Sequence, residues 1–151
     1  MRLAILLFVV LSVIAASHAY WASGGVWPAS NPKALSDTVV GDSRATAMPS
    51  AGLTYVVAGL IFTAGLVALA RTAELPGLIR WIPHLGCWVL TVVFGLRGAF
   101  TYAATVGVAQ WPYELTEPFR TLDRLAYAPL CLTISAGFFI LALRGGPVTP
   151  D

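Results

Sequence analysis

The sequence predicts an all-α protein, a four-helix transmembrane bundle with both termini on the same side of the membrane. Three observations support this prediction. Of the 151 residues, 58% are hydrophobic and only 11% are charged, and the mean hydropathy is +0.79. An average soluble domain carries about 25% charged residues. The apolar residues also gather in four segments, each close to the ~20 residues that a helix needs to cross ~30 Å of hydrocarbon.

The four apolar segments predict helices at about 3–22, 51–71, 81–107 and 124–144 in a single domain, 1–151. Because lipid offers no hydrogen-bond partners to backbone amides, spanning segments must be helices or closed barrels. These segments are continuously apolar and do not alternate with polar residues, which favours helices. The connection of residues 24–50 is polar and long, and loops of that length are usually functional or disordered.

The first segment, LAILLFVVLSVIAASHAYW from Leu3 to Trp21, has two interpretations. Arg2, the apolar run and the small residues around Ala19 also resemble a signal peptide that is cleaved after the segment. The apolar run is longer than the roughly 7–15 residues of a signal-peptide core. We therefore expect an uncleaved helix.

Positive charges close to the ends of the spans predict the orientation. The basic residues on the side of the two termini lie directly next to the ends of spans. On the opposite side, two of the basic residues lie far from any span, within the long loop of residues 24–50. We therefore expect both termini in the cytoplasm and the 24–50 loop outside. The two sets are Arg2, Arg71, Arg80 and Arg144 on the terminal side, and Lys33, Arg44, Arg120 and Arg124 on the other.

Two unusual polar residues are expected at the same depth. His18 lies about fifteen residues into the first span, roughly 22 Å along its axis, and Arg97 lies at roughly 21 Å in the third. Both belong to the outer half of the bilayer, and we expect them to face each other. Asp123 and Tyr127 open the fourth span from that side, and Trp21 shares a helix face with His18 by i, i+3 spacing.

A charge within a span costs several kcal/mol unless it is paired or hydrated, so Arg97 marks a candidate site. In the favoured interpretation it pairs with Asp123 and clamps the third helix to the fourth. The alternative is that Arg97 binds an anionic ligand, and the two roles are compatible because a guanidinium has more donors than one carboxylate uses.

His18 also has two interpretations. Its imidazole either bonds a carbonyl near the end of its own helix or on a neighbour, or it carries protons with Asp123 or Glu114 as its partner. The first is favoured because the partners are inferred from depth alone. Trp21 fits an interfacial belt of aromatic residues without any ligand.

Other site classes find no support. His18 and His84 are expected at opposite faces of the membrane and cannot share a haem iron. Cys87 and Cys131 lie at different depths, which argues against a redox pair. No metal-ligand spacing or phosphate loop is present, so we expect neither a metal nor a cofactor. The net charge of +2 is too small and scattered for a nucleic-acid partner.

A row of small residues, Gly95, Ala99, Ala103 and Gly107, follows the third span. Such rows let helices approach closely in lipid. We expect this row to pack within the bundle, and it also suits a homo-oligomer or a larger membrane complex. The partners expected are membrane lipids and a small amphiphilic ligand.

Three motifs occur in order along the chain: HAYWASGGVWP from His18 to Pro28, LRG from Leu96 to Gly98, and PFRTLDRLAYAPLCL from Pro118 to Leu132. Together they resemble an uncharacterised domain-of-unknown-function family of small four-helix bacterial integral membrane proteins. The resemblance implies four helices and a bacterial inner membrane, and it carries no activity. The pattern positions it implies are His18, Trp21, Gly24, Gly25, Arg97, Asp123, Tyr127 and Pro129.

The sequence thus leaves three hypotheses for function. The first is a binding or accessory protein whose polar pocket takes a lipid head group or small amphiphile near the outer leaflet. The second is a membrane-embedded isomerase or hydrolase that acts on a lipid-soluble substrate, with His18 and Asp123 as candidate catalytic residues. The third is a structural subunit of a larger complex. The pocket expected under the first hypothesis is lined by His18, Trp21, Arg97, Asp123 and Tyr127.

Overall fold

The computed structural model describes residues 1–144 and is all-α. Within this part, four helices are long and apolar enough to cross a membrane, which makes the chain a multi-pass membrane protein. The elements in order are α1 (Arg2–Ala22), α2 (Pro32–Val39), α3 (Ala51–Ala70), a 3₁₀ turn (Gly77–Arg80), α4 (Trp81–Thr105), α5 (Glu117–Leu122), a π-helix (Asp123–Tyr127) and α6 (Ala128–Leu143).

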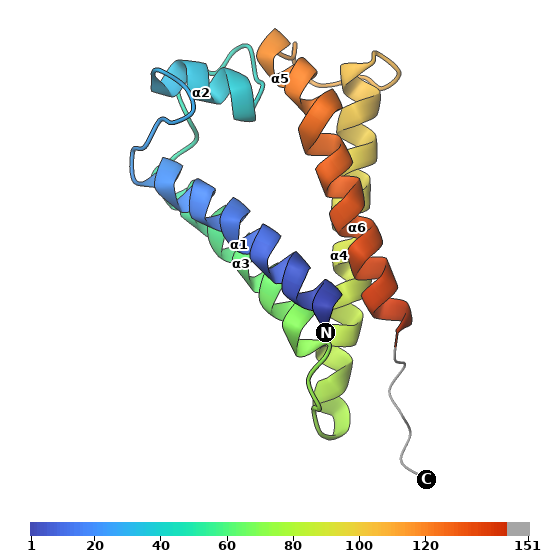
Figure 1. Cartoon of the computed structure of the whole chain (residues 1–151). Helices are drawn as coiled ribbons and strands as arrows, with labels where there is room; N and C mark the ends of the chain where they lie inside the picture. The colour runs from blue at the N-terminus through green and yellow to red at the C-terminus, as the bar shows by residue number, and fades with distance from the viewer. Residues whose placement is uncertain (145–151) are drawn as a thin grey trace.

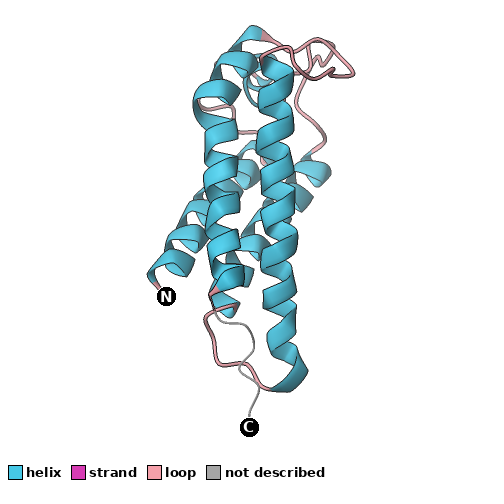
Figure 2. Cartoon of the chain, turned by 90° about the vertical axis from the view of Figure 1, so that its right-hand side faces the viewer, coloured by secondary structure: helices cyan, strands magenta, loops and turns pink. Residues whose placement is uncertain are grey.

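The spans form two helical hairpins that meet at one end and diverge toward the other (Figure 1). α1 packs along α3 and α4 packs along α6, whereas the two pairs touch over a smaller region. In the view from the side, α4 and α6 run next to each other in front of α1 and α3, which are inclined to them (Figure 2). α1 begins and α6 stops at the same end of the molecule, which we call the arginine end. α2 and α5 lie at the opposite end, which we call the capped end.

The core that joins the two hairpins draws buried side chains from all four spans. In α1, Ala4, Leu7 and Leu11 are buried and follow the three- and four-residue spacing of one helix face. The other buried members are Ala64, Ala68, Cys87, Ile134, Phe138, Leu141 and Ala142.

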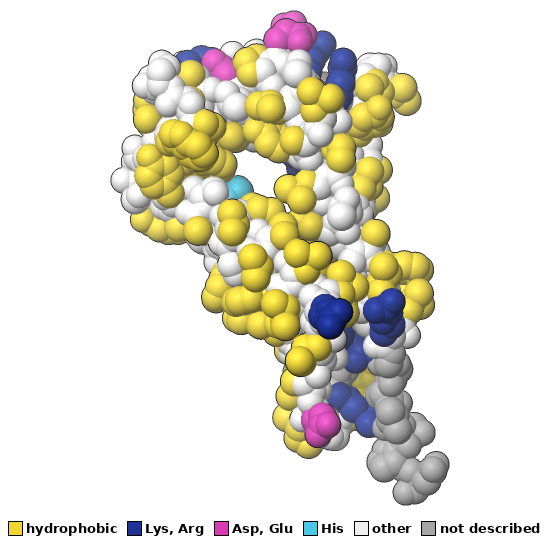
Figure 3. Space-filling view, viewed as in Figure 1, with side chains coloured by type: hydrophobic (Ala, Val, Ile, Leu, Met, Phe, Trp, Pro, Cys, Tyr) yellow, Lys and Arg dark blue, Asp and Glu magenta, His cyan; other side chains and the backbone are white. Residues whose placement is uncertain are grey.

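Most of the span surface is apolar and exposed. Only 11% to 39% of the apolar part of each span is buried within the molecule. Hydrophobic side chains cover the outside over nearly the whole height of the hairpins (Figure 3). A water-soluble protein rarely exposes an apolar surface of this extent, so this is the surface expected to face lipid tails.

A glycine lets α4 approach α6 closely. A Cβ added at Gly98 would lie 2.9 Å from Cγ of Leu132 and 3.0 Å from the carbonyl oxygen of Ala128, so only glycine fits without displacement. Nearby, the Ser135 hydroxyl donates to the carbonyl of Thr91 at 2.7 Å. Close backbone approach and inter-helix hydrogen bonds are the usual means of holding helices together in lipid.

The predicted row of small residues on this helix is only partly correct. Gly95 does face α6, but Ala99 is exposed, and Gly107 lies beyond the end of α4 at a φ of +79°. The contact face instead includes the buried residues Gly98, Thr101 and Thr105, which recur at intervals of three and four residues. This is the spacing of a left-handed helix pair, not of a strict four-residue row.

The connection of residues 24–50 contains a helix, α2, that its polar composition did not predict. The side chain of Asn31 caps it by accepting a hydrogen bond from the amide of Ala34 at 2.9 Å, and Pro32 occupies the first turn. α2 lies across the capped end and packs against α5, with Leu35 fully buried (Figure 1). The long loop therefore forms a cap over the diverging hairpins.

An isolated antiparallel bridge ties the first loop to the third. The amide of Ser43 donates to the carbonyl of Glu114 at 3.1 Å, and the amide of Thr116 donates to the carbonyl of Gly41 at 3.0 Å. Thr116 also donates through its hydroxyl to the carbonyl of Asp37 in α2. These bonds fasten the cap to the start of the fourth span.

Protonation of Asp42, which lies in this bridge, is expected to loosen it. The Arg44 guanidinium, bonded to the carboxylate at 3.1 and 3.3 Å, holds the pKa of Asp42 below its ordinary value of 3.8. A carboxylate with a lower pKa in the folded state adds stability above its unfolded pKa and loses it as the pH falls through the folded pKa. We therefore expect hydrogen-exchange protection of the Ser43 amide to fall below about pH 4. Arg44→Gln should weaken that pH dependence, although the backbone amide of residue 44 still donates to the Asp42 carboxylate, and an unchanged dependence in this variant would contradict the assignment.

The fourth span begins at Glu117, earlier than the predicted start near residue 124. Thr116 stands at the N-cap position and Pro118 in the first turn, a combination that favours helix initiation. From there α5, the π-helix and α6 follow one another directly and form a single candidate span, Glu117–Leu143. Asp123 therefore lies within the helical run and not at its beginning.

Candidate functional site

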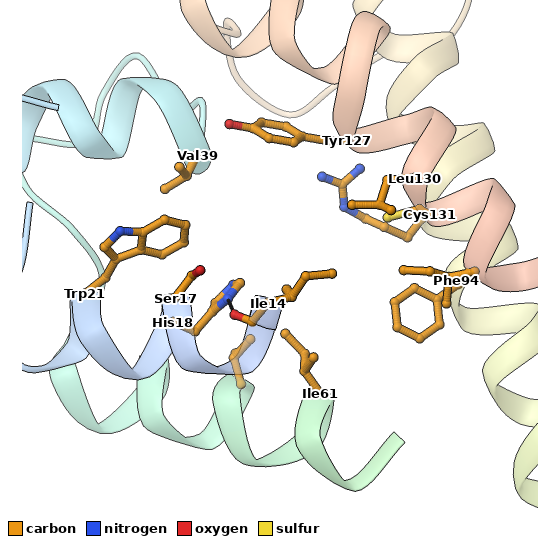
Figure 4. Close-up of a pocket in the computed structure, with 13 residues that line it drawn as sticks. Ile14, Ser17, His18, Trp21, Val39, Ile61, Phe94, Tyr127, Leu130 and Cys131 are labelled. Carbon is orange, nitrogen blue, oxygen red and sulfur yellow. Dashed lines mark hydrogen bonds between the residues drawn. The ribbon is translucent and has the colours of Figure 1, made fainter. Parts of the chain in front are cut away.

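A cavity of about 400 Å³ lies between the two hairpins, and we call it the hairpin cavity. Side chains from α1 and α3 line one side, and side chains from α4, the π-helix and α6 line the other, with Val39 of α2 at its edge (Figure 4). The space-filling view shows an opening between the hairpins below the cap (Figure 3). The lining residues are Ile14, Ser17, His18, Trp21, Val39, Val57, Ile61, Phe94, Arg97, Tyr127, Leu130, Cys131 and Ile134.

The structure brings four of the five predicted site residues to this cavity. His18 and Trp21 reach it from α1, Arg97 from α4, and Tyr127 from the end of the π-helix. His18 and Arg97 therefore lie on different hairpins and border the same space, as their equal depth predicted. Asp123 is not among the lining residues, because it is buried beside Arg97.

Arg97 and Asp123 form an ion pair between α4 and the π-helix. Nη1 of Arg97 donates to Oδ1 of Asp123 at 3.2 Å, and the Asp123 side chain is 0% exposed whereas that of Arg97 is 38% exposed. Arg97 also donates to the hydroxyl of Thr101. The second carboxylate oxygen of Asp123 is buried without a hydrogen-bond partner among residues 1–144. The predicted clamp between the third and fourth spans is confirmed.

The π-helix places Asp123 and Tyr127 on the inner side of the fourth span. Its wider turn is closed by the amide of Ala128, which donates to the carbonyl of Asp123. Pro129 follows immediately and has no N–H to donate to Leu125, so the α-helical ladder is interrupted at this point. π turns of this kind occur often at functional sites.

The Nδ1 atom of His18 lies 2.8 Å from the carbonyl oxygen of Ile14, one turn earlier in α1. A carbonyl can only accept, so this bond assigns a proton to Nδ1, and in the corresponding tautomer Nε2 is an acceptor. The ring also packs against Trp21, with centroids 5.1 Å apart. Within the described chain His18 makes no hydrogen bond to Asp123, so the two are not arranged as an acid–base dyad.

The motif that follows His18 ends α1 and reverses the chain. The indole N–H of Trp21 donates to the carbonyl of Trp27 at 2.8 Å. Gly24 has a φ of +96°, and a Cβ at Gly25 would lie 2.2 Å from the ring of Tyr20. The turn therefore requires glycine at both positions, whereas the Trp21 ring borders the hairpin cavity.

Tyr127 connects the fourth span to the cap. Its hydroxyl donates to the carbonyl of Thr38, near the end of α2, at 3.3 Å. Val39, the next residue, lines the cavity. The cap is therefore held over the cavity from the same π-helix that contains Asp123.

Sequence reasoning missed the apolar residues that make up most of the cavity wall. On α6, Leu130, Cys131 and Ile134 share the face of Tyr127 by intervals of three, four and seven residues. That spacing was available in the sequence. It does not distinguish a cavity wall from an ordinary packed interface, because both require the same apolar stripe.

Comparisons with known proteins identify a family but no activity. The family model described as "Protein of unknown function (DUF3995)" matches residues 11–138, which is most of the chain. No curated protein and no solved structure matches the chain.

Proposed function

Since the chain belongs to the DUF3995 family of proteins of unknown function, we propose its function from the geometry of its own residues. The protein binds an amphiphile in the hairpin cavity, with an anionic head group at Arg97 and an apolar tail along the cavity wall. The single observation that carries this proposal is a partly exposed arginine side chain, that of Arg97, in a cavity whose wall is otherwise mostly apolar.

The size and composition of the cavity support a small-molecule ligand. Ligand sites commonly enclose about 300–1,000 Å³ and combine apolar walls with a few polar groups. The hairpin cavity measures about 400 Å³, and the polar side chains in its wall include Ser17, His18, Arg97 and Tyr127. Its position between two diverging transmembrane hairpins makes it accessible to amphiphilic molecules dissolved in the membrane.

The guanidinium of Arg97 retains donors for an anion. Its Nη1 atom is used by Asp123 and Thr101, while Nε and Nη2 make no hydrogen bond to other described residues. The planar fork of an arginine suits a carboxylate or phosphate better than a lysine does. Across the same cavity, Nε2 of His18 offers an acceptor for a hydroxyl of the head group.

The proposal is tested by titrating the purified protein in mild detergent with a dibrominated C18 fatty acid and the corresponding alcohol. Bromine quenches tryptophan fluorescence, and Trp21 borders the cavity. We expect saturable quenching with the acid, and at least about tenfold weaker binding of the alcohol, because a charge-assisted pair with Arg97 is lost. Trp21→Phe should remove most of the saturable component.

Two pairs of variants sharpen this test. Val57→Phe places a ring in the cavity and should abolish saturable quenching, whereas Val56→Phe alters the neighbouring, 58% exposed residue and should not. Arg97→Lys should reduce the preference for acid over alcohol about tenfold. Equal binding of acid and alcohol, or an unaffected Val57→Phe protein, would contradict the proposal. Chemical conversion of the ligand that His18→Gln abolishes would instead identify an enzyme.

A further inference from the structure

A second pocket lies at the arginine end, between the start of α1 and the ends of α3 and α6. It has a volume of about 460 Å³, and its lining includes Arg2, Arg71 and Arg144 together with Leu3 and Leu141. We call it the arginine pocket. It is separated from the hairpin cavity by the core that joins the hairpins, and it is independent of the function proposed above.

The charges around the arginine pocket are unbalanced. Among residues 1–144, none of its three arginines lies within 4.0 Å of a carboxylate oxygen, although the other end of the molecule contains several ion pairs. The C-termini of α3 and α6 each carry about half a negative charge and the N-terminus of α1 carries about half a positive charge, so the helix ends offset less than one arginine. Like charges held together repel each other, so the pocket favours an anion.

Arg71 has one N–H group without a hydrogen-bond acceptor among the described residues. Its Nη2 atom donates to the backbone carbonyl of Arg144 at 3.0 Å, which fixes the guanidinium between α3 and α6. Its Nε atom is buried and has no acceptor among the described residues. A buried N–H without a partner destabilises the protein, and a small shift of the Arg71 guanidinium toward the pocket would let this N–H donate to an anion bound there.

We propose that the arginine pocket binds the phosphate of an anionic phospholipid from the adjoining leaflet. The pocket lies where three spans leave the membrane, which is the depth of the phosphate and glycerol groups. Leu3 and Leu141 provide apolar wall on the membrane side of the arginines, where the acyl chains of a lipid begin. Basic pockets between transmembrane helices bind lipid head groups in this way.

The test is native mass spectrometry of the detergent-purified protein with added phosphatidylglycerol, phosphatidylcholine or inorganic phosphate. Phosphatidylglycerol should bind at least tenfold more tightly than phosphatidylcholine, and millimolar inorganic phosphate should not displace it. The combined variant Arg2→Gln, Arg71→Gln, Arg144→Gln should weaken phosphatidylglycerol binding about a hundredfold, at about fivefold per arginine. A control that removes three charges at the capped end, Lys33→Gln, Arg44→Gln, Arg120→Gln, should bind within twofold of the original protein.

Arg2→Gln alone keeps the test decisive if the triple variant does not fold. Arg2 makes no hydrogen bond or ion pair through its side chain to the described residues, so its loss should leave the fold intact and weaken phosphatidylglycerol binding about fivefold. Equal binding of the two lipids, or unchanged binding by Arg2→Gln, would overturn the proposal. Displacement by inorganic phosphate at concentrations close to those of the lipid would show a site for free phosphate and would also overturn it.

Discussion

Arg97→Ala is expected to lower the free energy of unfolding by about 3 kcal/mol, because it leaves the Asp123 carboxylate buried without its cation. Asp123 is 0% exposed, and its second oxygen already has no partner, so no other described group compensates for the loss. We take the lower end of the range for buried ion pairs because Arg97 is itself 38% exposed. Denaturation of the purified protein with increasing sodium dodecyl sulfate, followed by circular dichroism, would measure the change.

Replacing both partners separates a broken pair from lost packing. The double variant Arg97→Met, Asp123→Leu removes both charges and keeps similar volumes, so it should recover most of the stability lost in Arg97→Ala. Arg97→Lys retains the charge and should fall between the original protein and Arg97→Ala. If the double variant is as unstable as Arg97→Ala, the buried carboxylate is not the cause, and the clamp does not have the role assigned to it.

Gly41→Val is expected to detach the cap from the fourth span. Gly41 has a φ of +80°, and an added Cβ would lie 2.4 Å from the ring of Phe119, which is itself only 3% exposed. The backbone strain and the overpacking each cost about 1–3 kcal/mol. We expect faster proteolysis of the segment around α2 and, under the function proposed above, at least about tenfold weaker binding in the hairpin cavity.

Gly107 provides the matched control for this experiment. Its φ is +79°, almost the same as that of Gly41, but a Cβ there would meet nothing within 4 Å. Gly107→Val therefore introduces the backbone strain without the contact with Phe119. It should leave α2 protected from proteolysis. Equal sensitivity of the two variants would show that the contact between Gly41 and Phe119 does not hold the cap.

The transmembrane architecture was predictable because it depends on local properties of the chain. The four apolar runs, their length and the lack of alternation are visible in the sequence, and the observed spans follow them. The pairing of Arg97 with Asp123 was also predictable, since a charge within a span needs a partner at its own depth. Helix rise alone sets that depth, so no tertiary information is required.

Two helices were missed although capping signals mark them. Asn31–Pro32 precedes α2 and Thr116 precedes α5 with Pro118 in its first turn, but both segments are short and polar, and the apolar pattern that identified the spans is absent there. The hairpin cavity was harder to predict. Its shape depends on how far two packed pairs diverge, and this angle depends on contacts between the pairs, such as that of Leu7 in α1 with Gly137 in α6, between residues distant in sequence.

The pairing of neighbouring spans also bears on how the protein is made. α1 contacts mainly α3, and α4 contacts mainly α6, so each half of the chain contains most of the contacts of its own hairpin. During synthesis, the two helices of the first hairpin can therefore insert into the bilayer and pack against each other before the second hairpin emerges from the ribosome. Biogenesis then ends with the docking of two preassembled units, and the ion pair of Arg97 with Asp123 forms within the later one.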